Sequence, residues 1–228
     1  RLYHRRALEQ IEFGRGDAAL LEIAVRFYMA GFRIAEVPFH YHPTGPYLKL
    51  GGFFRLAWSF AKAMVQLRPL RSSIASADYD YRAFHSRHPF QRYWQRRRYA
   101  FVRGFVEEYQ EGVDLGCGSS VILDSLPGVI GVDISHPKLR FLRGQTERQL
   151  VRADIRELPF ADRAFDLCIC SQVIEHLPED PRTFAELRRL VRPGGVLILG
   201  TPDYDKRAWR MIEWLYKRAA PGGYGDEH

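Results

Sequence analysis

A glycine-rich turn is the first feature of the sequence that could do chemistry. Residues 113–118 read VDLGCG, so a short apolar run leads directly into Gly116 and Gly118, with Asp114 before them and Cys117 between them. Because neither glycine has a side chain, a ligand can approach the backbone N–H groups of such a turn closely. The pattern predicts a ligand-binding turn between a strand and a helix. A glycine turn without a ligand is the alternative.

Two more acids follow this turn at even spacing. Asp133 ends the run VIGVD, 19 residues after Asp114, and Asp154 lies 21 residues further along, in RADIRELPF. An acid at the end of the second strand is suited to accept hydrogen bonds from both ribose hydroxyls of a nucleoside. Asp154 could bind the exocyclic amine of adenine while the aliphatic side chain of Ile155 packs on the ring. Since the carboxyl ends of parallel strands border one crevice, the three acids predict a nucleoside site there.

Short apolar runs alternate with helical patterns from residue 111 onward, which is typical of a parallel βαβ sheet. We predict strands near residues 112–115, 129–133, 149–153, 166–171 and 195–200. Helices are predicted near residues 119–126, 136–145, 180–191 and 205–219. The predicted fold class is therefore α/β, with a Rossmann-like, doubly wound and mostly parallel sheet in a domain over residues 91–228.

The residues before this domain have a different pattern. A helix is predicted over 17–30, with Asp17 as its N-cap and Gly31 as its C-terminal cap. A strand is expected over 32–41, and Pro38 indicates an edge position for it.

A strongly apolar helix is predicted over 53–67, because its polar residues form one narrow stripe. Such a helix is either buried in a core or lies in a membrane interface. Residues 72–90 have no clear period and are interpreted as a linker or lid, and residues 91–110 as an Arg-rich helix. We therefore divide the chain into residues 1–71, 72–90 and 91–228.

The composition is that of a globular protein, with 228 residues, of which 46% are hydrophobic and 27% are charged. The net charge of +7 is concentrated in residues 1–71, which carry 11 basic and 5 acidic side chains. This distribution disfavours uniform nucleic-acid binding and favours contact with an anionic membrane or phosphate. The three cysteines have neither disulfide-framework nor zinc-site spacing, so we expect a cytoplasmic protein without a metal.

Residues 112–201 carry five motifs in an order that resembles the class I S-adenosylmethionine-dependent methyltransferases: VDLGCG, VDIS, RADIRELPF, FDLCICSQVIEHLP and LVRPGGVLIL. The resemblance implies S-adenosylmethionine as the cofactor. The cofactor-binding residues that it implies are Asp114, Gly116, Cys117, Gly118, Asp133, Ile134, Asp154, Ile155, Ser171 and Gln172. The alternative is a nicotinamide dehydrogenase. Its fingerprint needs a third small residue in the turn, which this sequence lacks.

A general base would assist methyl transfer to an oxygen or a nitrogen. His176 is the nearest candidate in the sequence, and a structural cap is the alternative role for it. Further candidates are Glu175, Asp203 and His228. By resemblance, the segment before the first motif covers the cofactor, which makes contacts from Tyr93, Trp94, Arg97 and Arg98 possible. Cys117, Cys168 and Cys170 are interpreted as packing residues.

Residues 17–67 resemble the carboxyl-terminal end of polyprenol-phosphate sugar transferases of the dolichol-phosphate mannosyltransferase kind. The resemblance rests on GFRIAEVPF at residues 31–39 and on the amphipathic helix after it. It implies a fragment of a glycosyltransferase–methyltransferase fusion that lacks the last strands of the methyltransferase sheet. The expected acceptor is then a small molecule or glycolipid, such as a sugar hydroxyl on a lipid-linked glycan. The alternative is a membrane-associated module, on the inner face of the membrane, whose methyltransferase domain binds the cofactor without turnover.

Overall fold

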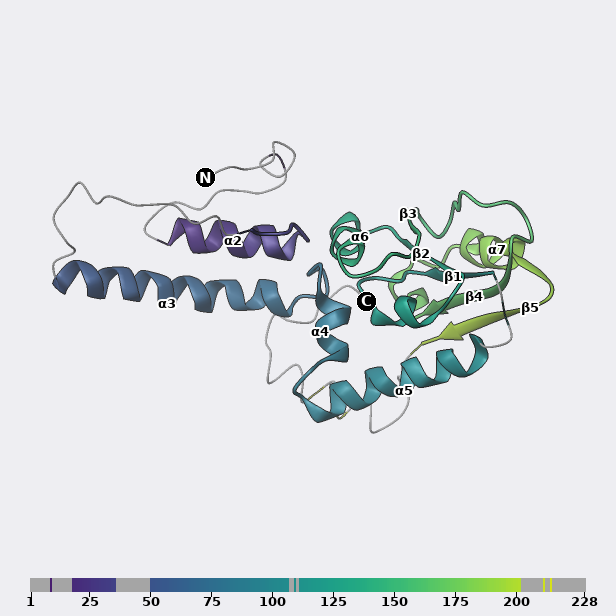
Figure 1. Cartoon of the computed structure of the whole chain (residues 1–228), viewed down its shortest axis with the longest axis horizontal. Helices are drawn as coiled ribbons and strands as arrows, with labels where there is room; N and C mark the ends of the chain where they lie inside the picture. The colour runs from purple at the N-terminus through teal and green to yellow at the C-terminus, as the bar shows by residue number, and fades with distance from the viewer. Residues whose placement is uncertain are drawn as a thin grey trace.

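The core of the protein is a five-stranded sheet in which every neighbouring pair of strands is parallel (Figure 1). The computed structural model describes residue 9, residues 18–35, 50–106, 109 and 111–201, and residues 211 and 214. The strand order is β3-β2-β1-β4-β5. The strands are β1 (Gly112–Leu115), β2 (Val129–Asp133), β3 (Leu150–Arg152), β4 (Phe165–Ser171) and β5 (Val191–Gly200). The predicted α/β class and all five predicted strands are confirmed.

Three of the helices that connect these strands match predicted positions with shifted ends: η1 (Val121–Ser125), α6 (His136–Arg143) and α7 (Pro181–Leu190). The short 3₁₀ helix η2 (Ile174–His176), between β4 and α7, was not predicted. The predicted helix 119–126 is only a short 3₁₀ turn, which Ser120 caps by accepting a hydrogen bond from the backbone N–H of Ile122. Strand β5 begins four residues earlier than predicted, because this edge strand accommodates Pro193 with a register shift beside Phe165. The predicted helix 205–219 falls outside the described residues except at positions 211 and 214, which are helical.

Two apolar clusters lie on opposite faces of the sheet because side chains alternate along each strand. On one face, α5 (Pro89–Val106), η1 and α6 pack against Leu167 and Ile169 of β4. On the other face, α7 packs against Cys168 and Cys170 of the same strand. The predicted burial of these cysteines is confirmed. The alternation leaves Asp114 on the face that α5 covers.

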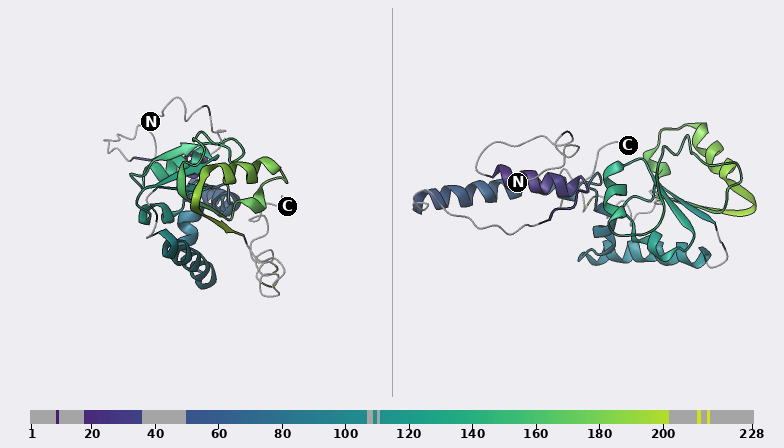
Figure 2. Two further views of the ribbon diagram at one scale, coloured as in Figure 1. Left: turned by 90° about the vertical axis from the view of Figure 1, so that its right-hand side faces the viewer. Right: turned by 45° about the horizontal axis from the view of Figure 1, so that its top comes forward.

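The predicted first helix is α2 (Ala19–Met29), and it lies side by side with α3 (Leu50–Ser72), which extends away from the sheet (Figures 1 and 2). Gly31 ends α2 as predicted, with a φ of +79°. The N–H of Phe32 donates to the carbonyl of Phe27, and the N–H of Gly31 to that of Tyr28. These bonds form a Schellman cap. Asp17 lies outside the described residues, and so does most of the predicted strand 32–41, whose first four residues are not in a strand.

Helix α3 is longer than predicted and is not buried. Ala63 and Leu67 are buried, whereas Phe54, Trp58 and Val65 are 63%, 75% and 72% exposed. Of the two alternatives left open for this helix, the described part of the chain does not bury it in a core, since only one side of α3 is covered. Within the described ranges, no helix combines the length and apolar character needed to cross a membrane.

The segment predicted as a linker or lid, residues 72–90, is folded against the sheet domain. It contains a turn and then α4 (Tyr79–Phe84), and α5 already begins at Pro89. Ser76, Ala77 and Asp78 are buried. The Asp78 carboxylate accepts a hydrogen bond from the Ser76 hydroxyl at 2.5 Å and pairs with Arg82 at 2.9 Å. This segment is ordered by local polar pairs rather than by apolar periodicity, which explains why the sequence pattern missed its structure.

Candidate functional site

The glycine turn joins β1 to η1 at the carboxyl end of the sheet. The N–H groups of Gly116 and Cys117 both donate to the carbonyl of Val132 on the neighbouring strand β2, at 2.7 and 3.0 Å. Gly116 and Gly118 have φ values of +74° and +57°, which side chains other than glycine rarely adopt. These hydrogen bonds fix the turn on the sheet. The turn follows β1, which lies between β2 and β4, where the strand order reverses.

Asp133, at the end of β2, is bound to this turn. Its Oδ2 accepts a hydrogen bond from the N–H of Gly118 at 2.8 Å, and its Oδ1 accepts one from the N–H of Ser135 at 2.7 Å. A carboxylate has about four lone-pair sites, so each oxygen keeps one for a further donor such as a ribose hydroxyl. The structure thus places Asp133 at the carboxyl end of β2, as predicted, and beside the glycine turn.

Asp114 is buried beneath the turn on the side of α5. Burial raises the pKa of Asp114 to about 7, opposed by the positive charge of Arg98 and reinforced by the charges of Asp133 and Asp80. Cys117 is also buried. Burial raises the pKa of the Cys117 thiol well above its ordinary value, and Asp114 adds to this shift. A thiol that keeps its proton is a poor nucleophile, in agreement with a packing role.

Asp154 follows β3, as predicted, and its carboxylate is held by Arg156. Two guanidinium hydrogen bonds of 2.9 and 2.6 Å and one backbone N–H bond lower the pKa of Asp154 to about 2. Ile155 is buried in the apolar cluster under α7, so its side chain is not the open surface expected beside Asp154. The exposed apolar side chain at these strand ends is Ile134, which is 61% exposed.

A cavity of about 500 Å³ lies between α5 and the carboxyl ends of β4 and β5. Ser171 and Gln172, which follow β4, line it on one side. Its lining residues are Trp94, Arg97, Arg98, Ala100, Phe101, Val102, Ser171, Gln172, Ile198, Leu199, Gly200 and Thr201. Three of the four predicted lid residues therefore reach the cavity. The fourth, Tyr93, is 63% exposed and is not part of the lining.

The candidate general base His176 lies at the end of η2. Its side chain is exposed, and it does not line the cavity. Its backbone N–H donates to the carbonyl of Val173 at 2.9 Å, which is the geometry of a short 3₁₀ turn. Glu175 precedes it in the same turn, and Asp203 and His228 lie outside the described residues.

One carboxylate at the site was missed by the sequence analysis. Asp80 of α4 accepts hydrogen bonds from the N–H and hydroxyl of Ser119, directly after the glycine turn. It contacts Gly118 so closely that a Cβ on that glycine would meet its Oδ2. Asp80 lies in a segment without apolar periodicity, far from the turn in the sequence, so no sequence signal pointed to it.

Residues 113–199 match the family model described as "Methyltransferase domain". The match spans the glycine turn, the three strand-end acids and strands β1 to β5. These residues form a class I methyltransferase domain, and its cofactor is S-adenosylmethionine.

Curated relatives are similar to part of the chain. A "Probable S-adenosylmethionine-dependent methyltransferase" of Mycolicibacterium smegmatis is 30% identical over 118 residues, which cover 49% of this chain and 46% of that protein. A tRNA (carboxymethyluridine(34)-5-O)-methyltransferase of Arabidopsis thaliana is 34% identical over 43% of this chain and 26% of its own length. A ubiquinone biosynthesis O-methyltransferase of Pasteurella multocida is 24% identical over 44% of this chain and 49% of its length. The chain thus spans half or less of each of these three relatives.

The charges around the turn of the methyltransferase domain fit this cofactor. S-adenosylmethionine carries a sulfonium, an ammonium and a carboxylate, so its net charge is positive. The turn is surrounded by three carboxylates, those of Asp80, Asp114 and Asp133, and by two cations, Arg98 and Lys138. When all five groups are ionised, the protein side has one excess negative charge, opposite in sign to the cofactor.

Proposed function

We propose that this chain transfers a methyl group from S-adenosylmethionine to an oxygen of a small acceptor that enters the cavity beside α5. The observation that carries the proposal is the position of that cavity. Ser171 and Gln172 line it directly after β4, and β4 is the neighbour of β1, which leads into the glycine turn. An acceptor in this cavity would therefore lie in the same crevice as a cofactor held at the turn.

The work of the protein in such a reaction is binding, alignment and exclusion of water. When bound, the cofactor supplies a methyl group made electrophilic by the sulfonium. The chain's own residues would then act mainly by proximity. In this proposal the amino-acid and ribose parts of the cofactor are held by the glycine turn and its acids, namely Asp114, Gly116, Cys117, Gly118 and Asp133. Asp154 and the exposed Ile134 lie toward its adenine part, whereas Ile155 packs beneath them in the apolar cluster. Ser171 and Gln172 close the pocket.

Among the described residues, none on the cavity lining is a carboxylate or histidine. His176 remains our hypothesis for the group that deprotonates an acceptor hydroxyl. The aromatic walls formed by Trp94 and Phe101 suit a flat or ring-shaped acceptor, whose faces they can cover. Arg97 and Arg98 add positive charge to the same wall.

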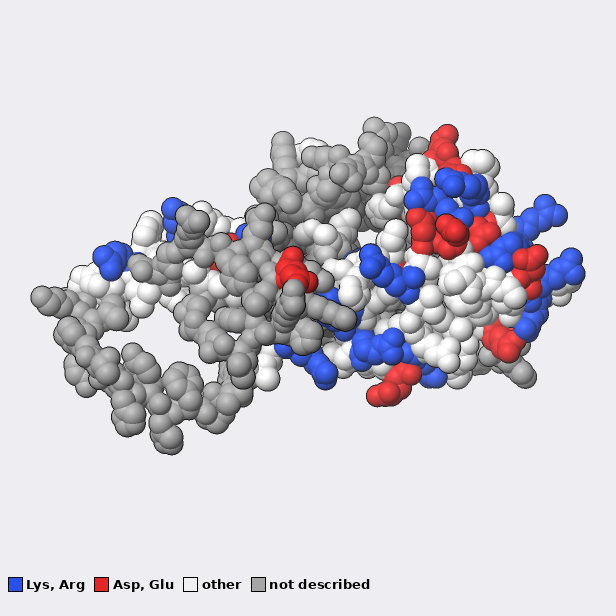
Figure 3. All heavy atoms as spheres, turned by 90° about the horizontal axis from the view of Figure 1, so that it is seen from above, with Lys and Arg blue, Asp and Glu red and all other residues white. Residues whose placement is uncertain are grey.

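A sugar hydroxyl on a lipid-linked glycan is the acceptor that we propose within this class. Support comes from the resemblance of residues 17–67 to a polyprenol-phosphate sugar transferase. The two relatives named as O-methyltransferases also favour oxygen as the acceptor atom. One of them is named for a tRNA, so RNA is the competing acceptor. In Figure 3, acidic and basic side chains are intermingled over the methyltransferase domain, which favours a small acceptor over a long polyanion.

An acceptor assay separates these possibilities. The chain is incubated with S-adenosylmethionine carrying a labelled methyl group and, in parallel, with a polyprenol-phosphate-linked sugar, a free quinol or bulk tRNA. Label in the lipid fraction, lost when Trp94→Ala opens the cavity wall, supports the proposal. Label only in the quinol or the tRNA would contradict the glycolipid acceptor and leave the methyltransferase activity in place.

The exposed side of α3 favours a second role, as an anchor on an anionic membrane surface. Phe53, Phe54, Trp58, Met64 and Val65 are all more than half exposed on this helix. Arg55 and Lys62 lie on the same helix and are exposed beside them, which is the pattern of an interfacial helix. We propose that α3 lies on lipid headgroups and brings the methyltransferase domain to a membrane-borne acceptor.

Vesicle sedimentation tests the anchor. We expect the chain to sediment with vesicles that contain anionic lipid, and Phe54→Ser together with Trp58→Ser to abolish this. Leu67→Ser is not a suitable control, because Leu67 is buried. Gln66→Ser changes an exposed polar position of the same helix and should leave sedimentation unchanged. Equal sedimentation of the double variant and the parent chain would contradict the anchor.

A further inference from the structure

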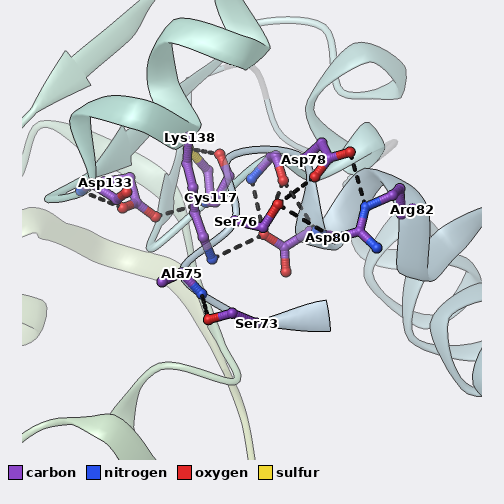
Figure 4. A network of polar contacts seen from close by, with 12 residues as sticks. Ser73, Ala75, Ser76, Asp78, Asp80, Arg82, Cys117, Asp133 and Lys138 are labelled. Carbon is purple, nitrogen blue, oxygen red and sulfur yellow. Dashed lines mark hydrogen bonds and ion pairs between the residues drawn. The ribbon is translucent and has the colours of Figure 1, made fainter. Parts of the chain in front are cut away.

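Asp80 joins an upstream segment to the glycine turn of the methyltransferase domain (Figure 4). Its Oδ2 accepts hydrogen bonds from the N–H of Ser119 at 3.0 Å and from the Ser119 hydroxyl at 3.2 Å. In return, the N–H of Asp80 donates to the same hydroxyl at 3.1 Å. The Nζ of Lys138 on α6 lies 3.2 Å from the same carboxylate oxygen. One carboxylate thus holds the turn and a cation of the helix that follows Asp133.

The surroundings keep Asp80 charged and in place. Burial alone would raise the pKa of Asp80, but Lys138, the Ser119 N–H and Arg98 together hold it below its ordinary value. The carboxylate occupies the space that a Cβ on Gly118 would need, so the turn and α4 fit each other without a gap. An ionised carboxylate with two hydrogen bonds and an ion pair is a strong, directional contact.

The segment that carries Asp80 is braced by its own polar contacts. Asp78 pairs with Arg82 at 2.9 Å and accepts a hydrogen bond from the Ser76 hydroxyl, and both partners belong to the segment itself (Figure 4). Asp78 and Asp80 therefore differ in one respect. The first stabilises the segment itself, whereas the second connects the segment to the turn.

The same segment is connected to the N-terminal helices. The N–H of Ala77 donates to the carbonyl of Met29, at the end of α2, at 3.0 Å. Helix α6, which supplies Lys138, also supplies Arg140. The guanidinium of Arg140 donates to the carbonyl of Ala30 at 3.2 Å and lies 3.8 Å from the ring centre of Phe32. The end of α2 and residues 76–84 therefore dock together beside the cofactor turn.

We propose that Asp80 is a positioning residue that clamps the glycine turn in its cofactor-binding conformation, so that docking of residues 73–84 and cofactor affinity are coupled. The inference rests on the proposed function, because it assumes that the turn binds S-adenosylmethionine. Asp80 lies upstream of the matched residues 113–199, so the family match does not assign it a role. The clamp orients the Ser119 N–H and sets the space above Gly118, and its loss leaves a buried donor without its acceptor.

An alternative role for Asp80, as a plug in the cofactor site, predicts the opposite change in cofactor affinity. If Asp80 were a plug that occupies the place of the cofactor's carboxylate, its removal would strengthen cofactor binding. A clamp weakens binding when it is removed. The sign of the change in affinity therefore decides between the two roles.

The test is calorimetric titration of the full chain with S-adenosylhomocysteine. We expect Asp80→Asn to weaken binding by about tenfold or more, because the neutral amide loses the ion pair with Lys138 and accepts weaker hydrogen bonds from Ser119 than a carboxylate does. Asp78→Asn is the matched control. It makes the same substitution two residues away. We expect Asp78→Asn to lower the thermal stability about as much as Asp80→Asn does, but to weaken cofactor binding much less. Lys138→Met gives a second variant should Asp80→Asn fail to fold. It removes the ion pair with Asp80 and the cation over the Tyr79 ring but leaves the hydrogen bonds between Asp80 and Ser119, and should weaken binding by a smaller factor.

The double variant Asp80→Asn with Lys138→Met provides a readout that a purely structural role would not change. Because both groups act through one contact, we expect its loss of affinity to be smaller than the product of the two single losses. Unchanged or tighter binding by folded Asp80→Asn, or equal losses in Asp78→Asn and Asp80→Asn, would overturn the clamp. Failure of the parent chain to bind S-adenosylhomocysteine would instead overturn the proposed function, and the inference with it.

Discussion

The buried carboxyl of Asp114 is the side chain of the site whose protonation responds most directly to pH near neutrality. Burial raises its pKa from 3.8 to about 7, so the folded chain keeps this proton over a range in which the unfolded chain has lost it. The contribution of Asp114 to the free energy of unfolding is therefore complete below pH 3.8, and is lost as the pH rises toward 7.

Asp114→Asn tests this directly, because an amide cannot ionise. Relative to the variant, the parent chain should lose free energy of unfolding between about pH 4 and pH 7, with a slope of up to about 1.4 kcal/mol per pH unit. Urea unfolding of both proteins at several pH values across this range measures the difference. Parallel stability curves for the two proteins would show that Asp114 titrates normally in the folded chain.

Among the individual residues of the site, the glycine turn and the acids at the ends of the strands could be predicted from the sequence. Asp114, Asp133 and Asp154 could be placed because each directly follows or belongs to an apolar strand run. The partners of these acids could not be predicted. Arg156 binds Asp154 through a local turn, and Asp80 reaches Ser119 from a segment whose order comes from ion pairs. Neither contact produces a periodic pattern of apolar residues from which it could be predicted.

The carboxyl end of helix α2 depends on a single residue, Gly31. Gly31 has a φ of +79°, and a Cβ at this position would meet the carbonyl oxygen of Pro137 on α6. Gly31→Ala should therefore lower the free energy of unfolding by about 1–3 kcal/mol, through backbone strain and the lost docking of α2 on α6.

The matched control is Gly104→Ala, within α5. A Cβ there meets nothing within 4 Å and the position is helical, so the substitution should raise the stability of the chain by about 0.5–1 kcal/mol. Chemical unfolding of the two variants beside the parent checks both signs. A Gly31→Ala chain that is as stable as Gly104→Ala would refute the strain argument.

The five strands were predictable because parallel strands that are covered on both faces are short, continuous apolar runs. The helix over residues 53–67 was also predicted, as part of α3, but the exposure of α3 and the structure of residues 72–90 were not. The apolar pattern of α3 predicts a buried surface, but the described part of the chain covers only one side of it. What an apolar helix packs against depends on tertiary contacts, which its own sequence does not contain.

In the whole molecule, the helical pair α2–α3 is attached to the sheet domain through the end of α2. Arg140 on α6 makes two of these contacts, with Ala30 and Phe32. Arg140→Met keeps an unbranched side chain but removes the hydrogen bond and the cation. We expect faster amide hydrogen exchange in α2, with exchange in β1 and β4 unchanged. Equal protection of α2 in both proteins would show that Arg140 does not hold the two parts together.

The division of the molecule into residues 1–71, 72–90 and 91–228 stays a prediction. The described contacts show that residues 73–84 pack on the glycine turn and bind the end of α2. A boundary drawn at residue 90 would therefore separate Asp80 from the site that it contacts.

The central claim is that the glycine turn and Asp133 bind S-adenosylmethionine. Calorimetric titration of the chain with S-adenosylhomocysteine, with NADH as the control ligand, tests it most directly. The account predicts binding of S-adenosylhomocysteine in the micromolar range, no binding of NADH, and loss of binding in Asp133→Ala. Binding of NADH in its place, or no binding of S-adenosylhomocysteine by the folded chain, would contradict it.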